Sequence, residues 1–269
     1  MKKRPCFGPG MMFVAVALVL FVLGPLAEIL IYPVLSFSPV LSYAILFLPY
    51  VLAFLTIYAA GERGDLYLTG KDGRKFSHKR FLLFFSLSFL FLALSSLFEK
   101  VAVNEVPLKR KLLSLLFSLL FIPMQTGVEE YLFRVLPVKM IPSWPEKKPN
   151  AFFVSVASGL LFMVPHILNP EARGSGGGWA LLHYFLWGFL ASLSALVSGG
   201  FEIPFALHAA NNLFVAVAVN YPGSALSSFS FFMAKERTTG ALEIIGVLLH
   251  FALAFAVFYI IGRRECHEK

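Results

Sequence analysis

The chain has 269 residues, of which 58% are hydrophobic and only 14% are charged, and its net charge is +8. Soluble domains carry about 25% charged residues, so the composition excludes an ordinary soluble protein and predicts an integral membrane protein. The excess of lysine and arginine is the usual sign of membrane topology, and we expect no nucleic-acid partner.

Eight apolar stretches are predicted to form membrane-spanning helices, although several lie near the lower limit of about 17 residues. They cover residues 11–32, 40–60, 81–98, 112–137, 151–168, 179–197, 203–220 and 241–261, and the fourth extends to residue 141 if Pro137 only kinks it. Residues 221–240 are expected to lie on the surface. No hydrophilic stretch is long enough for a separate soluble domain, so we expect one all-α, polytopic membrane domain over residues 1–269.

The basic residues also predict an orientation. Eight spans place both termini on one side, and most of the 23 lysine and arginine residues fall on that side. We therefore expect both termini and the loop 61–80 to be cytoplasmic. The two cysteines, Cys6 and Cys266, form neither a disulfide framework nor a CxxC metal pair. The expected location is the cell membrane, or the endoplasmic reticulum membrane if the source is eukaryotic, with membrane lipids as partners.

Three charged residues, Glu129, Glu130 and Arg134, interrupt the fourth span. Each charge at such a depth costs at least about 2.5 to 3.5 kcal/mol, so the three need a compensating use. On a helix, Glu130 and Arg134 are one turn apart and can pair, whereas Glu129 is turned about 100° from Glu130. We predict that Glu130 and Arg134 neutralise each other as structural support and that Glu129 is the reactive carboxylate.

Two later spans carry imidazole and amide groups. His166 follows Pro165, which cannot donate to the carbonyl of Leu161 and is expected to bend or interrupt the helix. His208 and Asn212 lie one turn apart on one helix face. Each group alone is more often an interhelical hydrogen-bonding group than a catalyst. Polar groups in membrane spans generally face one another or water, so we expect these groups and Glu129 to share one cavity.

The other polar residues of the spans receive a structural interpretation. Glu28 and His183 are expected near span ends. Glu243 and His250 lie on roughly one face of the last span and are expected to serve packing.

In order, Glu129-Glu130-x-x-x-Arg134, Phe162-x-x-x-His166 and His208-x-x-x-Asn212 resemble the three motifs of the CAAX protease and bacteriocin-processing enzyme family, also called the CPBP or ABI family. The resemblance covers about residues 112–220. It implies an all-helical intramembrane endopeptidase that hydrolyses a peptide or lipidated-protein substrate. Glu129 and His166 would activate a water molecule, and His208 and Asn212 would stabilise the oxyanion. These roles agree with the chemistry of general bases and of oxyanion donors.

Three alternatives stay open. Glu129, His166 and His208 form a two-histidine, one-carboxylate set that suits zinc with an open water position, although the HExxH spacing is absent. A non-catalytic protein of the same fold, such as a bacteriocin self-immunity factor or a scaffold, is the second alternative. A proton-coupled transporter is the third, because intramembrane acids and histidines also form proton relays. The His208–Asn212 pair favours an enzyme, because acyl transfer needs oxyanion donors and a proton path does not.

Straight helices do not bring the four predicted catalytic residues to one depth. At about 1.5 Å per residue, Glu129 lies about 12 to 18 Å from the cytoplasmic end of its span, His208 about 8 Å and Asn212 about 14 Å. The same rise places His166 at about 23 Å. Helix tilt or the break at Pro165 has to supply the difference.

Overall fold

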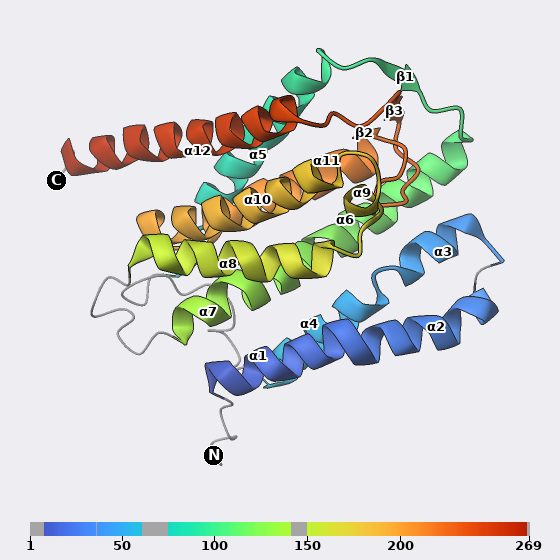
Figure 1. The fold of residues 1–269 in the computed structure, drawn as a ribbon, viewed down its shortest axis with the longest axis horizontal. Coiled ribbons are helices and arrows are strands. Elements are labelled where there is room, and N and C mark those ends of the chain that lie inside the picture. The colour runs from blue at the N-terminus through green and yellow to red at the C-terminus, as the bar shows by residue number, and fades with distance from the viewer. Residues whose placement is uncertain (1–7, 36, 61–74, 141–149, 268–269) are drawn as a thin grey trace.

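Helices form nearly all of the regular structure in the computed structural model, which describes residues 8–35, 37–60, 75–140 and 150–267 (Figure 1). The first helices are α1 (Pro9–Leu18), the π-helical turn η1 (Val19–Leu23), α2 (Gly24–Leu35), α3 (Pro39–Ile45), α4 (Leu48–Ala60) and α5 (His78–Ser96). The middle of the chain forms α6 (Leu108–Glu130), the π-helical turn η3 (Tyr131–Val135), α7 (Leu136–Lys139), α8 (Ala151–His166) and α9 (Pro170–Arg173). The last helices are α10 (Gly177–Ser198), α11 (Glu202–Val217) and α12 (Ala241–His267).

Six helical segments of the described residues are long and apolar enough to cross a membrane: Pro9–Val34, Pro39–Ala59, His78–Ser96, Leu108–Lys139, Gly177–Ser198 and Ala241–Ile261. They expose much apolar surface, as a lipid-facing protein should; Leu30, for example, is 76% exposed. The prediction of an all-α, polytopic membrane protein is therefore confirmed.

The other two predicted spans correspond to α8 and α11, which have 16 residues each. At 1.5 Å per residue such a helix is about 24 Å long, which is shorter than a hydrocarbon core of about 30 Å. Asn150 begins α8 by accepting a hydrogen bond from the N–H of Phe152, and α8 ends at His166, one residue after Pro165. These two short helices carry His166, His208 and Asn212.

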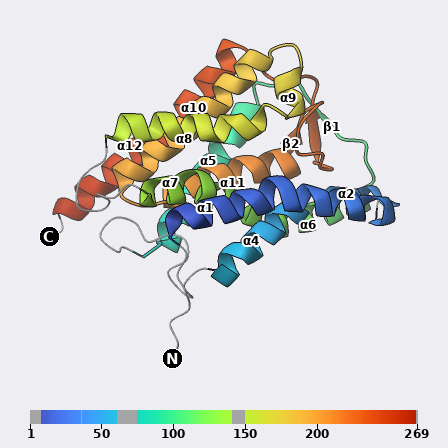
Figure 2. The ribbon, with the colours of Figure 1, turned by 60° about the horizontal axis from the view of Figure 1, so that its bottom comes forward.

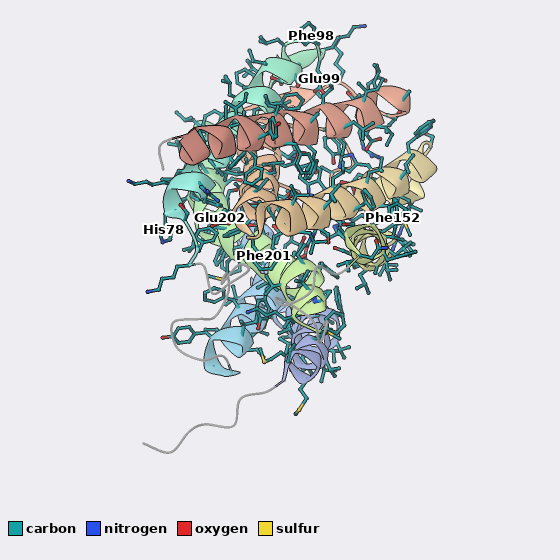
Figure 3. All side chains as sticks on the ribbon, turned by 90° about the vertical axis from the view of Figure 1, so that its left-hand side faces the viewer. His78, Phe98, Glu99, Phe152, Phe201 and Glu202 are labelled. Atoms are coloured by element: carbon teal, nitrogen blue, oxygen red, sulfur yellow. The ribbon has the colours of Figure 1, made fainter. Side chains whose placement is uncertain are left out.

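The helices form two groups, as Figures 1 and 2 show. In one group, α8 packs along α10, and α11 packs against α5 and α6. In the other, α1 to α4 lie together, and α4 contacts α6. The start of α1 and the end of α12 lie at one end of the molecule, and the strands lie at the opposite end (Figure 1). His78 and Glu202 are both visible from the end that Figure 3 views, and the N–H of Ser77 donates to Glu202 at 3.0 Å.

A small sheet closes the opposite end. Its strands are β1 (Val101–Val103), β2 (Val219–Asn220) and β3 (Phe232–Ala234), in the order β1-β3-β2. β3 runs antiparallel to β1 and parallel to β2. The segment 221–240 is thus more ordered than a surface connection, and it buries Ser230 completely.

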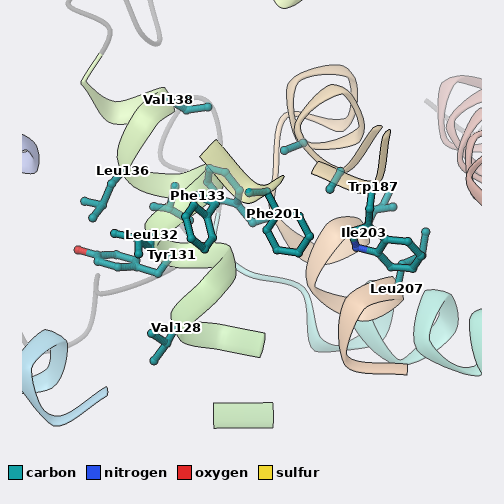
Figure 4. Close-up of a cluster of buried hydrophobic side chains, with 14 of the residues drawn as sticks. Val128, Tyr131, Leu132, Phe133, Leu136, Val138, Trp187, Phe201, Ile203 and Leu207 are labelled. Atoms are coloured by element: carbon teal, nitrogen blue, oxygen red, sulfur yellow. The ribbon is translucent and has the colours of Figure 1, made fainter. Parts of the chain in front are cut away.

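Close packing of α8 on α10 depends on two glycines. A Cβ atom added to Gly188 would lie 2.8 Å from the Cβ of Phe162 and 2.9 Å from the Cα of Gly159. A buried apolar cluster continues from this contact through η3 and α11 (Figure 4). Its labelled members are Val128, Tyr131, Leu132, Phe133, Leu136, Val138, Trp187, Phe201, Ile203 and Leu207. This cluster surrounds the polar residues of the candidate site.

Candidate active site

The two predicted carboxylates lie where an α-helix changes into a π-helical turn. Glu129 and Glu130 end α6, and Arg134 lies in η3. All three side chains are buried, and Arg134 has no exposed surface. π-helical turns within α-helices occur frequently at functional sites, so the local backbone agrees with the motif in marking this segment.

Glu130 contacts two partners through one carboxylate oxygen. Nη1 of Arg134 lies 3.3 Å from Oε1 of Glu130, so the predicted contact is present. Nδ1 of His208 donates to the same oxygen at 2.7 Å, a contact that the sequence did not predict. Glu130 therefore joins α6 to α11 and fixes the orientation of the His208 ring.

Nε2 of His208 faces Glu129 and Asn212. It lies 3.5 Å from Oε2 of Glu129 and 3.3 Å from Nδ2 of Asn212, and the predicted spacing of one turn brings His208 and Asn212 together. Because Nδ1 donates to Glu130, a neutral His208 has a lone pair on Nε2 and accepts from Asn212. Nε2 becomes a donor only when the ring carries two protons.

The charges of this group balance when His208 is an imidazolium. Glu129 and Glu130 then supply two negative charges, and Arg134 and His208 supply two positive charges. With a neutral imidazole and both carboxylates ionised, the group carries one net negative charge. Buried charges are tolerated when they are paired and hydrogen-bonded, and Glu130 contacts both Arg134 and His208.

His166 is partly buried, and its Nδ1 donates to the carbonyl of Phe162 at 2.6 Å. Nε2 therefore has the lone pair that a base needs. The His166 ring lies 4.1 Å from the ring of Tyr184 and 4.4 Å from that of Phe162. Phe162 also lies 5.6 Å from His208, so one aromatic ring contacts both histidines.

The structure explains how His166 reaches the depth of the other residues. Oγ of Ser158 donates to the carbonyl of Phe133 at 2.9 Å, which places these two residues at the same level. His166 lies about 12 Å further along α8, and Glu129 about 6 Å back along α6 and η3, at 1.5 Å per residue. The two helices run in opposite directions, so the difference in level is only about 6 Å. This difference lies within the gap of about 5 to 11 Å between Glu129 and His166 that straight helices give.

Glu129 contacts two residues that the sequence analysis did not identify. Nε2 of Gln125 donates to Oε1 of Glu129 at 3.3 Å, and the hydroxyl of Tyr50 in α4 donates to the same carboxylate. Gln125 lies one helical turn before Glu129, a spacing that marks it in the sequence. No local pattern marks Tyr50, because it lies in a different span far along the chain.

A cavity of about 890 Å³ connects these groups. Its inner part is lined by Tyr50, Glu129, His166, His208 and Asn212. The four predicted catalytic residues therefore share one cavity, as expected from the sequence. Their catalytic roles remain a prediction.

The same cavity extends to a second polar cluster near the sheet. Glu243 in α12 contacts Arg237 and lies 3.2 Å from Nδ1 of His183 in α10. Glu171 in α9 accepts hydrogen bonds from the hydroxyl of Tyr221 and the N–H of Ala225. Burial and the neighbouring Glu171 carboxylate raise the pKa of Tyr221 well above its ordinary value, so this hydroxyl stays protonated as a donor. His183, Glu243 and His250 all line the cavity, which the packing interpretation of Glu243 and His250 did not predict.

The zinc alternative lacks a grouped ligand set in this arrangement. Glu129 and His208 approach each other, but His166 is not grouped with them as a third metal ligand among the described residues. Within residues 8–35, 37–60, 75–140 and 150–267, no group of three His, Cys, Asp or Glu side chains is placed to hold a metal ion. We therefore derive no step through a metal.

Fold and site together define a polytopic α-helical membrane protein with a cavity lined by ionisable residues. Residues 110–214, which contain all four predicted catalytic residues, match the family of type II CAAX prenyl endopeptidase Rce1-like proteins. This match agrees with the resemblance of the three motifs to the CAAX protease family.

One curated relative matches part of the chain. Over 126 residues, 47% of this chain, it is 29% identical to the uncharacterized protein YyaK of Bacillus subtilis (strain 168). The match spans 41% of that protein, so the chain covers less than half of its relative's length.

Proposed function

We propose that this protein is an intramembrane endopeptidase that hydrolyses a peptide bond with water. The observation that carries the proposal is the placement of Glu129. It is a buried carboxylate that lines the cavity together with His166, His208 and Asn212, within the segment that matches the Rce1-like family. The substrate is a peptide or a lipidated protein that enters the cavity within the lipid bilayer.

Glu129 and Nε2 of His166 generate the nucleophile. The attacking water gives its proton to Glu129, and its oxygen forms a bond to the carbonyl carbon. Gln125 and Tyr50 hold the Glu129 carboxylate through hydrogen bonds, so Glu129 enters the reaction with little freedom to reorganise.

Asn212 and His208 stabilise the tetrahedral oxyanion. Nδ2 of Asn212 has two protons, so it can donate to the oxyanion while it contacts His208. Doubly protonated His208 adds an Nε2–H donor, while its Nδ1–H remains on Glu130. When the C–N bond breaks, Glu129 returns its proton to the leaving nitrogen, and the products are an amine and a carboxylic acid.

The decisive experiment compares two isosteric changes. Glu129→Gln removes the base, whereas Glu28→Gln makes the same chemical change on α2, outside the cavity lining. Both proteins are purified in detergent and assayed on a library of fluorogenic peptides, with and without a chelator. Glu129→Gln should abolish cleavage and Glu28→Gln should retain it. Retained cleavage in Glu129→Gln contradicts the proposal, and a wild-type protein that cleaves nothing favours the non-catalytic alternative.

The proposed orientation places both termini in the cytoplasm. Lys79 in α5 and Arg173 in α9 are both exposed. Ser77 contacts Glu202 at the start of α11, and Glu171 contacts Tyr221 beyond the end of α11, so Lys79 and Arg173 lie toward opposite ends of that helix. With Cys6 and Cys266 replaced by serine, a membrane-impermeant maleimide added to intact cells should label a cysteine at Arg173 and miss one at Lys79. The reverse labelling pattern contradicts this orientation.

A further inference from the structure

The outer part of the cavity is acidic, although the whole chain has a net charge of +8. Four carboxylates line it, from Glu99, Glu171, Glu236 and Glu243, and we call this group the acidic vestibule. Among the described residues that line the cavity, Arg237 is the one lysine or arginine. A cavity lined in this way attracts positively charged groups and repels negatively charged ones.

Arg237 is already engaged within the protein. It donates to the Glu243 carboxylate and, through Nη1, to the backbone carbonyl of Glu171 at 3.4 Å. One guanidinium therefore contacts both acidic residues and holds α9 beside α12. Because its donors are directed at protein oxygens, Arg237 is poorly placed to receive an anionic substrate group.

Two carboxylate oxygens of the acidic vestibule lack a partner. Glu171 is 7% exposed and the Glu243 side chain is 7% exposed. Oε2 of each is buried and has no hydrogen-bond partner within the part of the chain that the structure describes, while each Oε1 is occupied. Leaving a buried charged oxygen unpaired costs free energy, so both atoms favour a ligand that donates hydrogen bonds and carries positive charge.

Ring contacts set the distance between the acidic vestibule and the catalytic residues. His183, which lies 3.2 Å from Glu243, stacks on Trp187 at 5.8 Å, and Trp187 lies 6.3 Å from His208. The His183 ring is therefore no more than about 12 Å from the His208 ring, a distance that about four residues of extended peptide span.

We propose that the acidic vestibule binds a lysine or arginine side chain of the substrate, within about four residues of the scissile bond. The protein then prefers cationic peptide segments. This assignment rests on the proposed function, because the occupant is a peptide that also reaches Glu129. Lysine and arginine side chains supply the positive charge and the N–H donors that a free carboxylate oxygen accepts.

Binding of a defined probe tests the proposal without cleavage. The protein carries Glu129→Gln, and the probe is a fluorescein-labelled, N-acetylated nonapeptide of leucine and serine with one lysine at successive positions. The matched peptide has norleucine in place of lysine. At the best position, lysine should bind about tenfold more tightly than norleucine, as expected for a charge-assisted hydrogen-bonded pair. A second peptide pair with a free amino terminus distinguishes a side-chain preference from capture of the terminal amine.

Two variants of the acidic vestibule and one control complete the experiment. Glu171→Gln and Glu243→Gln retain an oxygen acceptor but lose the charge, and each should remove most of the lysine preference. Glu28→Gln should leave the preference unchanged. If the two vestibule variants do not fold, the test uses a peptide with glutamate in place of lysine and a protein with an unaltered vestibule. The glutamate peptide should bind more weakly than the norleucine peptide.

The outcomes separate this inference from the proposed function. If the Glu129→Gln protein prefers the lysine peptide but the wild-type protein hydrolyses no peptide, the vestibule assignment stands and the proposed endopeptidase activity is wrong. If the wild-type protein cleaves peptides but the lysine, norleucine and glutamate probes bind equally well, the vestibule assignment is wrong and the proposed endopeptidase activity stands. A preference that disappears on N-acetylation assigns the acidic vestibule to a terminal amine, and the side-chain assignment is then wrong.

Discussion

Removing the charge of Glu130 should destabilise the protein far more than removing the charge of Glu129. Glu130 is 1% exposed, and its partner Arg134 is fully buried. Glu130→Gln keeps an oxygen acceptor for Nδ1 of His208 but leaves the Arg134 guanidinium without the carboxylate that it contacts at 3.3 Å. Breaking a buried pair in this way costs about 3–5 kcal/mol, a large part of a total stability of about 5–15 kcal/mol.

A second substitution, at Arg134, should restore much of the stability that Glu130→Gln removes. Arg134→Met eliminates the unpaired cation and leaves an unbranched side chain beside the ring of Phe162, over which the guanidinium now lies at 4.1 Å. Replacing both members of a buried ion pair with neutral groups of similar size is often neutral or stabilising. The double variant Glu130→Gln/Arg134→Met should therefore be more stable than Glu130→Gln alone.

The assay is the folded fraction that remains after heating, measured by fluorescence-detected gel filtration in detergent. At about 2–4 °C per kcal/mol for a chain of this size class, Glu130→Gln should lower the midpoint by about 6–20 °C. The double variant should recover at least half of that loss, whereas Glu129→Gln and Glu28→Gln should each change the midpoint little. If the double variant is no more stable than Glu130→Gln, the pair does not act as a buried ion pair, and the division of roles between the two carboxylates is wrong.

Asn212→Ala should lower kcat by about 10²- to 10³-fold with little change in KM, because it removes one oxyanion donor. Steady-state kinetics on a cleavable fluorogenic peptide measure both constants. Near-full turnover of the variant would mean that Asn212 serves packing only. Tyr50→Phe removes one hydrogen bond to Glu129 and should alter the pH profile of kcat while the folded yield stays the same; an unchanged profile contradicts a positioning role. Gly188→Ala should reduce folded yield, because its new methyl would lie 2.8 Å from Phe162, whereas a methyl on Gly127 would meet Phe205 at an ordinary 3.7 Å. Equal yields of the Gly188→Ala and Gly127→Ala proteins would contradict the close packing of α8 on α10.

Local spacing predicted the parts of the site that lie within one helix. Four residues separate Glu130 from Arg134, and four separate His208 from Asn212. Both pairs meet in the structure because helical geometry alone decides such contacts. The resemblance to a known family then grouped the motifs correctly, and the matching segment 110–214 agrees with it.

The sequence did not predict the contacts between helices. The Nδ1 contact of His208 to Glu130 and the hydroxyl contact of Tyr50 to Glu129 depend on how far each helix is displaced along its neighbour. Hydrophobic periodicity shows which face of a helix is buried but not its displacement. The sheet was missed for a related reason: its strands have two or three residues each, which is too short for an alternating pattern.

Phe162 shows how apolar packing positions the polar residues of the candidate site. Its ring lies against the Arg134 guanidinium at 4.1 Å, against His166 at 4.4 Å and against His208 at 5.6 Å. Its backbone carbonyl also accepts the Nδ1 proton of His166, so the same residue determines which nitrogen of that ring is basic. Gly188 allows the Phe162 backbone to approach α10 closely enough for these contacts. The Phe162-x-x-x-His166 spacing is therefore more than a label for the imidazole, because the phenylalanine sets both the position and the tautomer of the proposed base.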